Sequence, residues 1–307
     1  MNCLRALPLE HLATALARGA ALELYLTPKP GLVDRADRGA HPDLSLGIME
    51  QSIGIVADYL ADLVVSLSAG DAFARQRDIA IAAEQRMFGE LGTNTHKGYI
   101  FLAGMLLIAR HHADSSDEAT VRRTLAALAS EFFATSPPPA SHGGYVRLRY
   151  GAGGIVHEAS RGLPALFDTA LPAFRACRAQ GGSFATASFA MLARLMQTVD
   201  DSTTLHRGGR TGLARVRRDG RRLERLIAAG DDYPAFLTAT NRAYVRLNLT
   251  MGGIADLLAL AYGWLLAGGE LGEDRWQRQT TAHLSAAAGD SRWAPAAGAL
   301  TGPASGA

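Results

Sequence analysis

Apolar residues recur every three or four positions along most of this chain, a spacing that places them on one face of an α-helix. Alternating patterns typical of β-strands are scarce, and the only modest example is the short segment 145–150. Alanine and leucine are abundant, which also favours helix. The sequence therefore predicts an all-α protein, a single multi-helix bundle of roughly ten helices. The clearest apolar series are Leu9, Leu12, Leu16, Ala20 and Leu24; Ile48, Ile55, Tyr59 and Leu63; Leu102, Met105, Leu106 and Ala109; and Phe189, Leu192, Leu195 and Met196.

Size and composition permit a substantial hydrophobic core. The chain has 307 residues, of which 48% are hydrophobic and 20% charged, so global disorder is not expected. We expect the helical domain to span residues 1–285. The segment 286–307 is rich in Ala, Gly, Ser and Pro and is expected to form a flexible tail.

Charge and cysteine content exclude several classes of protein. The net charge is +2, which does not suit a nucleic-acid binder. The two cysteines, Cys3 and Cys177, form no disulfide framework and no metal-ligand spacing. The apolar stretch 252–269 is short and contains Asp256, so we expect a buried core helix rather than a membrane span. With no signal peptide visible, the sequence predicts a cytoplasmic protein.

Four polar segments interrupt the helical pattern, and they carry most of the side chains able to do chemistry. They are residues 27–42, 135–154, 199–209 and 248–253, each marked by glycine, proline or clustered polar residues. Functional groups commonly lie on loops held by a rigid scaffold. Candidate site residues are therefore expected in these segments and at the helix ends beside them.

A further polar segment, residues 92–98, is the densest of all and lies between two segments expected to be helical, 78–91 and 99–109. It contains Asn94, His96 and Lys97. If Thr93, Asn94 or Thr95 caps the second helix, His96 and Lys97 fall in its first turn, where free backbone N–H groups and the helix dipole favour an anion. A phosphate-bearing ligand follows, although a capped helix with a solvated His and Lys explains this segment equally well.

Acidic residues in the other segments suggest metal binding and proton transfer. Asp200 and Asp201 follow an apolar helix and precede His206 and Arg207; a Mg²⁺ ion carried on a triphosphate would suit their hard oxygens. Two solvent-exposed acids at a helix end are the alternative. Asp256 lies just inside a very apolar helix that starts at Gly252 and Gly253. An acid there is costly unless it is paired or near the helix N-terminus, and simple capping is the alternative.

The remaining candidate site residues are two acids, one lysine and an arginine-rich run. Asp34 follows Pro30 and Gly31 and could bind metal or act as a base, with Lys29 near a phosphate or merely solvated. Glu84 precedes the Asn94 segment on a helix, where an exposed Glu is the commoner case. The arginine-rich run 207–225 is best explained as a solvated helix face, except near Asp200 and Asp201, where phosphate contacts are expected. Zinc, Walker-type and Rossmann motifs are absent from the sequence.

Six blocks of this sequence, in order over roughly residues 20–270, resemble the triphosphoribosyl-dephospho-CoA synthase family. The stretches Leu24–Thr27 and His41–Ser45 are closer to its malonate decarboxylase branch. One departure is the segment 248–251, which lacks the proline that the family usually has before Gly252 and Gly253. The blocks are Thr27-Pro28-Lys29-Pro30-Gly31-Leu32-Val33-Asp34, Gly39-Ala40-His41, Asn94-Thr95-His96-Lys97-Gly98, Arg161-Gly162-Leu163-Pro164, Asp200 to Gly209, and Gly252-Gly253-Ile254-Ala255-Asp256-Leu257-Leu258.

The resemblance implies an all-helical enzyme that uses ATP and 3′-dephospho-CoA and releases adenine, with Mg²⁺ accompanying ATP. Its product is the prosthetic-group precursor for the acyl carrier protein of malonate decarboxylase or citrate lyase. We assign catalytic roles to Asp34, Glu84, Asp201 and Asp256, substrate binding to Lys29, Asn94, His96, Lys97, His206, Arg207, Gly252 and Gly253, and metal binding to Asp200 and Asp201.

Two other functions stay open on the sequence. One is a metal-dependent helical enzyme, a hydrolase or synthase, that acts on another phosphorylated ligand. The other is a non-catalytic chaperone for a carrier protein. We expect neither nucleic acid nor membrane as a partner, and a homodimer is compatible with the sequence.

Overall fold

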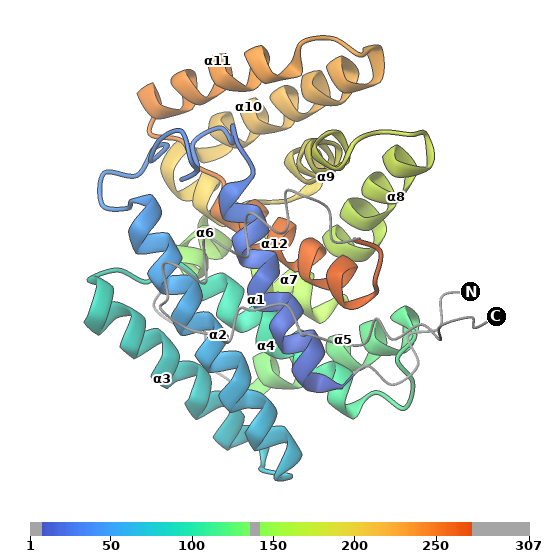
Figure 1. Ribbon diagram of the computed structural model, residues 1–307. Helices are drawn as coiled ribbons and strands as arrows, with labels where there is room; N and C mark the ends of the chain where they lie inside the picture. Colours follow the sequence, from blue (N-terminus) through green and yellow to red (C-terminus); the bar gives the residue numbers. More distant parts are fainter. Residues whose placement is uncertain (1–7, 136–141, 272–307) are drawn as a thin grey trace, which may run out of the picture.

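The computed structural model describes residues 8–135 and 142–271, and within these ranges it is all-helical (Figure 1). The described residues form twelve α-helices and one π-helical segment, without a strand, which confirms the predicted fold class. The predicted tail, 286–307, lies outside the described residues. The elements are α1 Leu9–Tyr25, α2 Leu46–Ser68, α3 Phe73–Leu91, α4 Lys97–His112, α5 Glu118–Thr135, α6 His142–Tyr150, α7 Gly154–Ser160, η1 Ala165–Ala170, α8 Leu171–Ala179, α9 Phe184–Thr198, α10 Ser202–Ala229, α11 Tyr233–Arg246 and α12 Gly252–Ala267.

Helices α1 and α12 pack closely against each other, and they cross at two glycines. A Cβ atom on Gly19 would lie 2.4 Å from the carbonyl oxygen of Ala259, and one on Gly263 would lie 2.9 Å from the Cα of Leu16. The absence of side chains at both positions therefore lets the two backbones touch. Almost every residue of α12 from Leu257 onward is buried, as expected for a core helix that is apolar all round. In the described part of the chain, none of the helices combines the length and apolar character that crossing a membrane requires.

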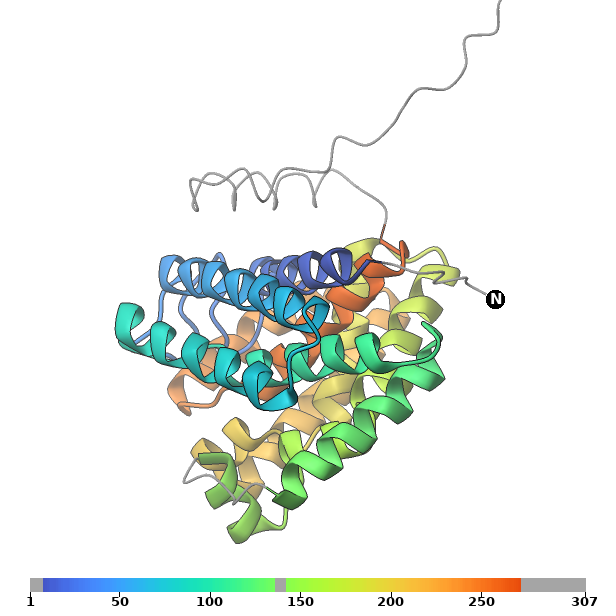
Figure 2. The same ribbon diagram turned by 90° about the horizontal axis from the view of Figure 1, so that it is seen from below.

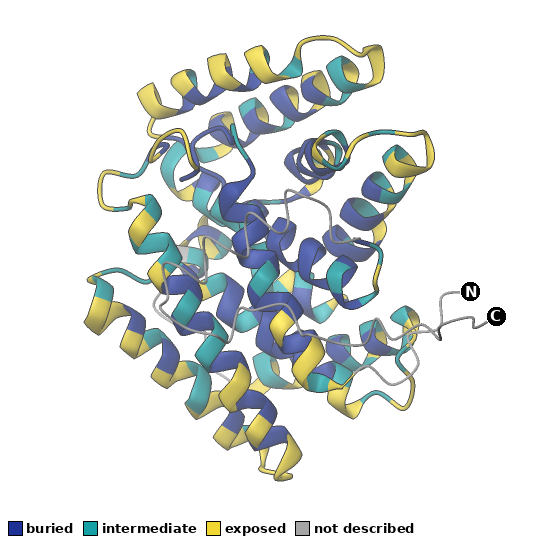
Figure 3. Ribbon diagram, viewed as in Figure 1, coloured by how far each residue is buried: buried dark blue, intermediate teal, exposed yellow. Residues whose placement is uncertain are grey.

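The other described helices pack with apolar residues facing inward. Figure 2 shows α1 and α2 side by side along one face, with α5 on the opposite side. Helices α10 and α11 pair at one edge of the molecule, and their outer faces are exposed, as is that of α3 (Figure 3). The buried residues run continuously through α1, α9 and α12, so the described helices share one main core.

The structure corrects two sequence-based expectations about local structure. The candidate strand 145–150 belongs to α6 because Val146 and Tyr150, four residues apart, pack with Leu205 and Leu213 in a small apolar cluster. Leu148, on the same alternating face as Val146, is 92% exposed, so the alternation marks no buried strand face.

The polar connection expected at 199–209 is also shorter than predicted. Only residues 199–201 link α9 to α10, and the following polar residues already belong to α10. Helix α10 bends at Gly209, whose φ of 59° and ψ of −160° are non-helical. That combination is essentially confined to glycine, so this residue sets the direction in which the rest of α10 continues.

Candidate functional site

The N-terminal ends of α4, α10 and α12 meet at one place in the bundle. An added Cβ on Gly98, in the first turn of α4, would lie 2.1 Å from Oδ2 of Asp256 in α12. Added Cβ atoms on Gly252 and Gly253 would each lie 3.0 Å from side-chain oxygens of Thr203 and Asp201. Gly98, Gly252 and Gly253 therefore allow the three helix starts to pack closely, while the predicted substrate binding by Gly252 and Gly253 stays a prediction. Helix starts carry free N–H groups and partial positive charge, so this region favours negative groups.

Asp201 joins two of these helix starts with a single carboxylate. It is almost fully buried, and its Oδ1 accepts a hydrogen bond from the Thr204 N–H at 2.7 Å while its Oδ2 accepts one from the Ile254 N–H at 2.8 Å. Burial raises the pKa of this carboxyl, and the backbone donors, including Gly253, oppose the increase. The structure thus gives Asp201 a capping role, while its predicted catalytic and metal-binding roles stay predictions.

Asp256 is the least satisfied acid of the site. It keeps some accessible surface, but the protein surrounds its carboxyl closely enough that desolvation raises its pKa well above the usual range. The negative charges of Glu23 and then Asp201 raise the pKa further. Among the residues that the structure describes, none donates a hydrogen bond to this carboxyl. A partly accessible acid with a raised pKa is suited to proton transfer.

Lys29 is a buried cation close to these acids. Its side chain is completely buried, and its Nζ lies 2.7 Å from Oε1 of Glu23, which is also buried, and donates to the Glu23 carbonyl oxygen. Desolvation raises the pKa of Glu23, and the neighbouring ammonium partly lowers it again. The predicted phosphate contact of Lys29 stays a prediction, because in this structure its ammonium faces Glu23. We call Glu23, Lys29, Asp201 and Asp256 the buried acid cluster.

His96 lies beside Lys29 and differs from the predicted arrangement. The sequence offered Thr93, Asn94 or Thr95 as possible caps of α4, but His96 itself is the N-cap residue and makes no side-chain capping bond. Its buried ring turns inward, with Nδ1 2.6 Å from the Ser52 hydroxyl and 3.1 Å from that of Thr95. Desolvation and the Lys29 charge lower its pKa to about 4, so the ring is neutral at physiological pH.

The loop between α1 and α2 is held by Asp34. Its Oδ2 accepts from the Lys29 N–H and its Oδ1 accepts from the Ala36 N–H, both at 2.7 Å. This buried carboxylate therefore organises the loop that carries Lys29, and its predicted catalytic role stays a prediction. Arg207 ties the same loop to the other half of the chain, because its Nη1 donates to the Ala40 carbonyl at 2.6 Å and to Asn248 at 3.1 Å.

The structure brings together three predicted residues at the junction of α3 and α4. Oε2 of Glu84 lies 2.8 Å from Nζ of Lys97 and accepts from the Asn94 amide at 3.4 Å. Lys97 is 58% exposed and is the first residue of α4, so its ammonium is accessible to an anion. The other predicted binding residue, His206, is exposed and contacts the Tyr145 ring edge-on.

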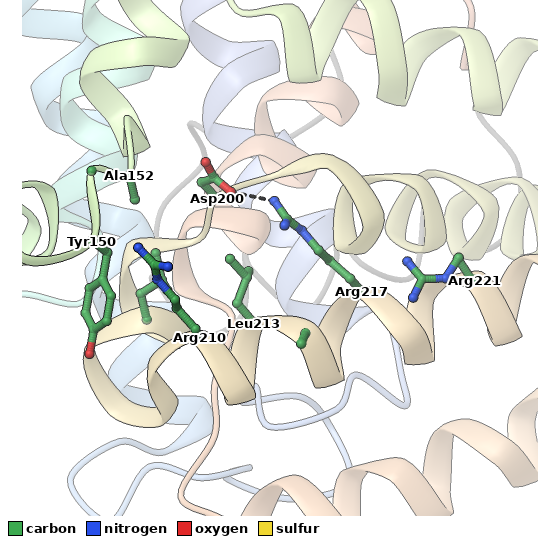
Figure 4. Close-up of a pocket in the computed structure, with 10 residues that line it drawn as sticks. Tyr150, Ala152, Asp200, Arg210, Leu213, Arg217 and Arg221 are labelled. Carbon is green, nitrogen blue, oxygen red and sulfur yellow. Dashed lines mark hydrogen bonds and ion pairs between the residues drawn. The ribbon is translucent and has the colours of Figure 1, made fainter.

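Asp200 lines a pocket of about 430 Å³ beside α10 (Figure 4). Its Oδ1 accepts from Nη2 of Arg217 at 2.5 Å. The pocket also contains Arg210 and Arg221 on the same side of α10, and Tyr150 closes one end. The two predicted metal ligands therefore point to different environments. Within the described ranges, no three His, Cys, Asp or Glu side chains converge as ligands for a metal ion.

Sequence reasoning missed Glu23 and did not single out Arg210, Arg217 or Arg221. The signal for Glu23 was an acid between Leu22 and Leu24 in the otherwise apolar stretch 19–25, where an unpaired charge would be costly. The signal for the arginines was their spacing of seven and four residues, which places all three on one helical face.

The fold and site thus define an all-helical protein with a buried acid cluster beside an arginine-lined pocket. The family model described as ATP:dephospho-CoA triphosphoribosyl transferase matches residues 9–275, and the chain belongs to this family. The predicted family is therefore confirmed.

Several curated proteins are similar to this chain over most of their length. A probable 2-(5″-triphosphoribosyl)-3′-dephosphocoenzyme-A synthase of Vibrio cholerae is 34% identical over 269 residues, covering 80% of this chain and 83% of the relative. A synthase of the same name from Pectobacterium atrosepticum is 34% identical, covering 82% and 86%. A probable synthase from Pseudomonas fluorescens is 35% identical, covering 81% and 89%. No solved structure matches the chain.

Proposed function

We propose that this protein transfers the triphosphoribosyl group of ATP to 3′-dephospho-CoA, forms 2′-(5″-triphosphoribosyl)-3′-dephospho-CoA, and releases adenine. Membership of the family and the names of the curated relatives support the reaction class. The single structural observation that carries the proposal is Asp256. It is an acid of raised pKa, free of hydrogen bonds from the described residues, at the meeting point of three helix starts.

The reaction breaks the bond between C1′ of the ATP ribose and adenine and forms a bond from C1′ to the 2′-hydroxyl of dephospho-CoA. The hydroxyl loses a proton and adenine gains one. A partly accessible carboxyl group whose pKa burial raises can donate or accept such a proton. We assign this proton transfer to Asp256. The negative charge of the surrounding cluster would stabilise the positive charge that develops on the ribose.

We further propose that Mg²⁺ enters with ATP and is held chiefly by the triphosphate oxygens. Two accessible acids, Asp200 and Glu84, are the protein groups that could approach such a complex, because Asp201 is buried and bonded to backbone N–H groups. When bound, Mg²⁺ neutralises phosphate charge. A site made by protein ligands alone is not supported within the described residues.

We also propose which acyl carrier protein receives the product. The stretches Leu24–Thr27 and His41–Ser45, which resemble the malonate decarboxylase branch, support delivery of the product toward the acyl carrier protein of malonate decarboxylase rather than citrate lyase. Activity of the product-loaded carrier protein in each decarboxylase or lyase complex would distinguish the two.

Chromatography of the nucleotide products tests the reaction. We expect free adenine from ATP only when 3′-dephospho-CoA is present. Coenzyme A should be a poor acceptor, since its 3′-phosphate places a dianion beside the attacking hydroxyl. ADP or AMP as the main product would overturn the proposal in favour of a hydrolase, and absence of any turnover would favour a carrier-protein chaperone.

Substitution of Asp256 tests its role within the reaction. Asp256→Asn keeps the shape of the side chain but removes the proton-transfer group, and we expect adenine release to fall about 10²- to 10⁴-fold. Asp231→Asn, in an exposed turn, is the matched control and should retain parental activity. Parental activity in a folded Asp256→Asn variant would remove Asp256 from the chemistry.

A further inference from the structure

Three arginines project from one face of α10 into the pocket that Asp200 enters (Figure 4). Arg210, Arg217 and Arg221 are separated by seven and four residues, so they form a row along the helix. Ala214 lies in the same row, and its small side chain leaves the floor of the pocket open between Arg210 and Arg217. The row spans about 16 Å along the helix axis at 1.5 Å per residue.

These arginines differ from their neighbours on α10 in having few partners. Arg215 and Arg218 form ion pairs with Asp219, and Arg222 stacks over the Phe236 ring. By contrast, neither Arg210 nor Arg221 pairs with an acid in the described part of the chain. Such unpaired guanidinium groups are available to a ligand.

Arg217 is only partly satisfied. It pairs with Asp200, but its buried Nε has no hydrogen-bond partner among the described residues. A buried donor without a partner is unfavourable in the free protein, and a ligand oxygen would satisfy it. With three guanidinium groups and one carboxylate, the pocket carries a positive excess and lies one residue from the buried acid cluster through Asp200 and Asp201.

We propose that this pocket binds a linear polyphosphate, and that its occupant in the reaction is the triphosphate chain of ATP. Guanidinium groups match phosphate oxygens in geometry and charge, and each can donate two hydrogen bonds. A single phosphate can reach only part of a row of this length, whereas a chain of three phosphates can meet all three arginines. The identity of the natural occupant rests on the proposed transferase function, but polyphosphate binding itself does not.

Calorimetric titration of the full chain with inorganic tripolyphosphate tests the pocket directly. We expect binding that weakens with added salt, and about tenfold or greater loss of affinity in each of Arg210→Ala, Arg217→Ala and Arg221→Ala. Arg225→Ala is the matched control, an exposed arginine on the same helix outside the pocket, and it should bind as the parent does. Equal affinity in the parent and the three pocket variants would overturn the proposal.

In contrast to the arginine variants, Asp200→Asn should raise the affinity for tripolyphosphate. The carboxylate competes with a phosphate for Arg217, so its removal should strengthen metal-free tripolyphosphate binding. Weaker metal-free binding in this variant would contradict the role assigned to Arg217.

Steady-state kinetics distinguish the two phosphate-bearing substrates. If the pocket holds the triphosphate, the pocket variants should raise the KM for ATP and leave that for 3′-dephospho-CoA unchanged. A rise for 3′-dephospho-CoA alone would assign the pocket to its diphosphate and overturn the triphosphate assignment. If no substrate pair turns over, the proposed function fails, while the tripolyphosphate titration still decides whether the pocket binds polyphosphate.

Discussion

The buried acid cluster and the arginine pocket meet at the Asp200–Asp201 dipeptide, yet they are built in opposite ways. In the cluster, the acids outnumber the cation Lys29, and neighbouring helices exclude most solvent. In the pocket, arginines outnumber the single acid Asp200, and the side chains remain largely accessible. Asp200 and Asp201 are adjacent in the chain, yet the carboxylate of Asp201 accepts from backbone N–H groups and that of Asp200 pairs with Arg217.

This contrast shows how one helix start can separate two tasks. Proton transfer benefits from a poorly solvated environment, because burial shifts the pKa of a carboxyl toward the values that catalysis needs. Recognition of a highly charged ligand benefits from accessible arginines that meet it before it is fully desolvated. The following substitutions test whether the two regions are energetically as different as their construction indicates.

The largest effect on stability is expected for Lys29→Met. Loss of the ammonium leaves Glu23 buried without its cation, and removal of one partner of a buried ion pair typically costs about 3–5 kcal/mol. Urea unfolding of the parent and the variant measures the difference. The double variant Glu23→Gln/Lys29→Met should recover part of the loss, because neither residue is then charged. A loss below about 1 kcal/mol in the single variant would show that the cluster is better hydrated than the structure indicates.

His96 should make the protein sensitive to mild acid. Its pKa falls from the ordinary value near 6.5 to about 4 in the folded state, so folding favours the neutral ring. The neutral His96 ring therefore contributes about 3 kcal/mol to the free energy of unfolding. This contribution is fully present above pH 6.5 and is lost as the pH falls toward 4.

The variant His96→Gln isolates this effect from that of the carboxyl groups. Asp256, Glu23 and Asp201 have raised pKa values, so they act in the opposite direction and favour folding at low pH. The difference in unfolding free energy between parent and variant, followed from pH 7 to pH 4, should therefore shrink as the pH falls. An unchanged difference over this range would contradict burial of a neutral His96.

The adjacent acids should differ in their effects on stability. Asp201→Ala leaves the N–H groups of Thr204 and Ile254 without their acceptor, and we expect a loss of about 2–3 kcal/mol. Asp200→Ala removes an exposed ion pair and should change stability by no more than about 0.5 kcal/mol. Thermal and urea unfolding of both variants check this comparison, and similar losses would show that Asp201 is not the joint between α10 and α12.

A small effect on stability is also expected for Lys97→Ala. Its pair with Glu84 is solvent-exposed, so the loss should stay below about 1 kcal/mol. If Lys97 contacts a phosphate of ATP, adenine release should nevertheless fall about 10- to 100-fold. Assays at equal folded fraction separate the two effects, and parental activity would remove Lys97 from the site.

The sequence predicted the helical fold and the segments that form the site, because apolar spacing and loop-forming residues are local signals. It did not predict the pairing of Glu23 with Lys29, which depends on how the loop after α1 folds back on that helix. Nor did it predict that Asp201 would cap a helix that begins about 50 residues later, at Gly252. Such roles depend on tertiary contacts, and the same carboxylate in a solvated loop would have the same sequence signature.

The bend of α10 at Gly209 sets the orientation of the arginine pocket relative to the buried acid cluster, and it does so without any charged group. The segment before the bend is anchored at Asp201, and the segment after it carries all three pocket arginines. The relative orientation of the two regions is therefore fixed by a backbone conformation that is essentially confined to glycine. A side chain at this position would disfavour this conformation and redirect the arginine row, without removing any ionisable group. The distance between a polyphosphate bound in the pocket and the acids of the cluster therefore depends on one uncharged residue, Gly209.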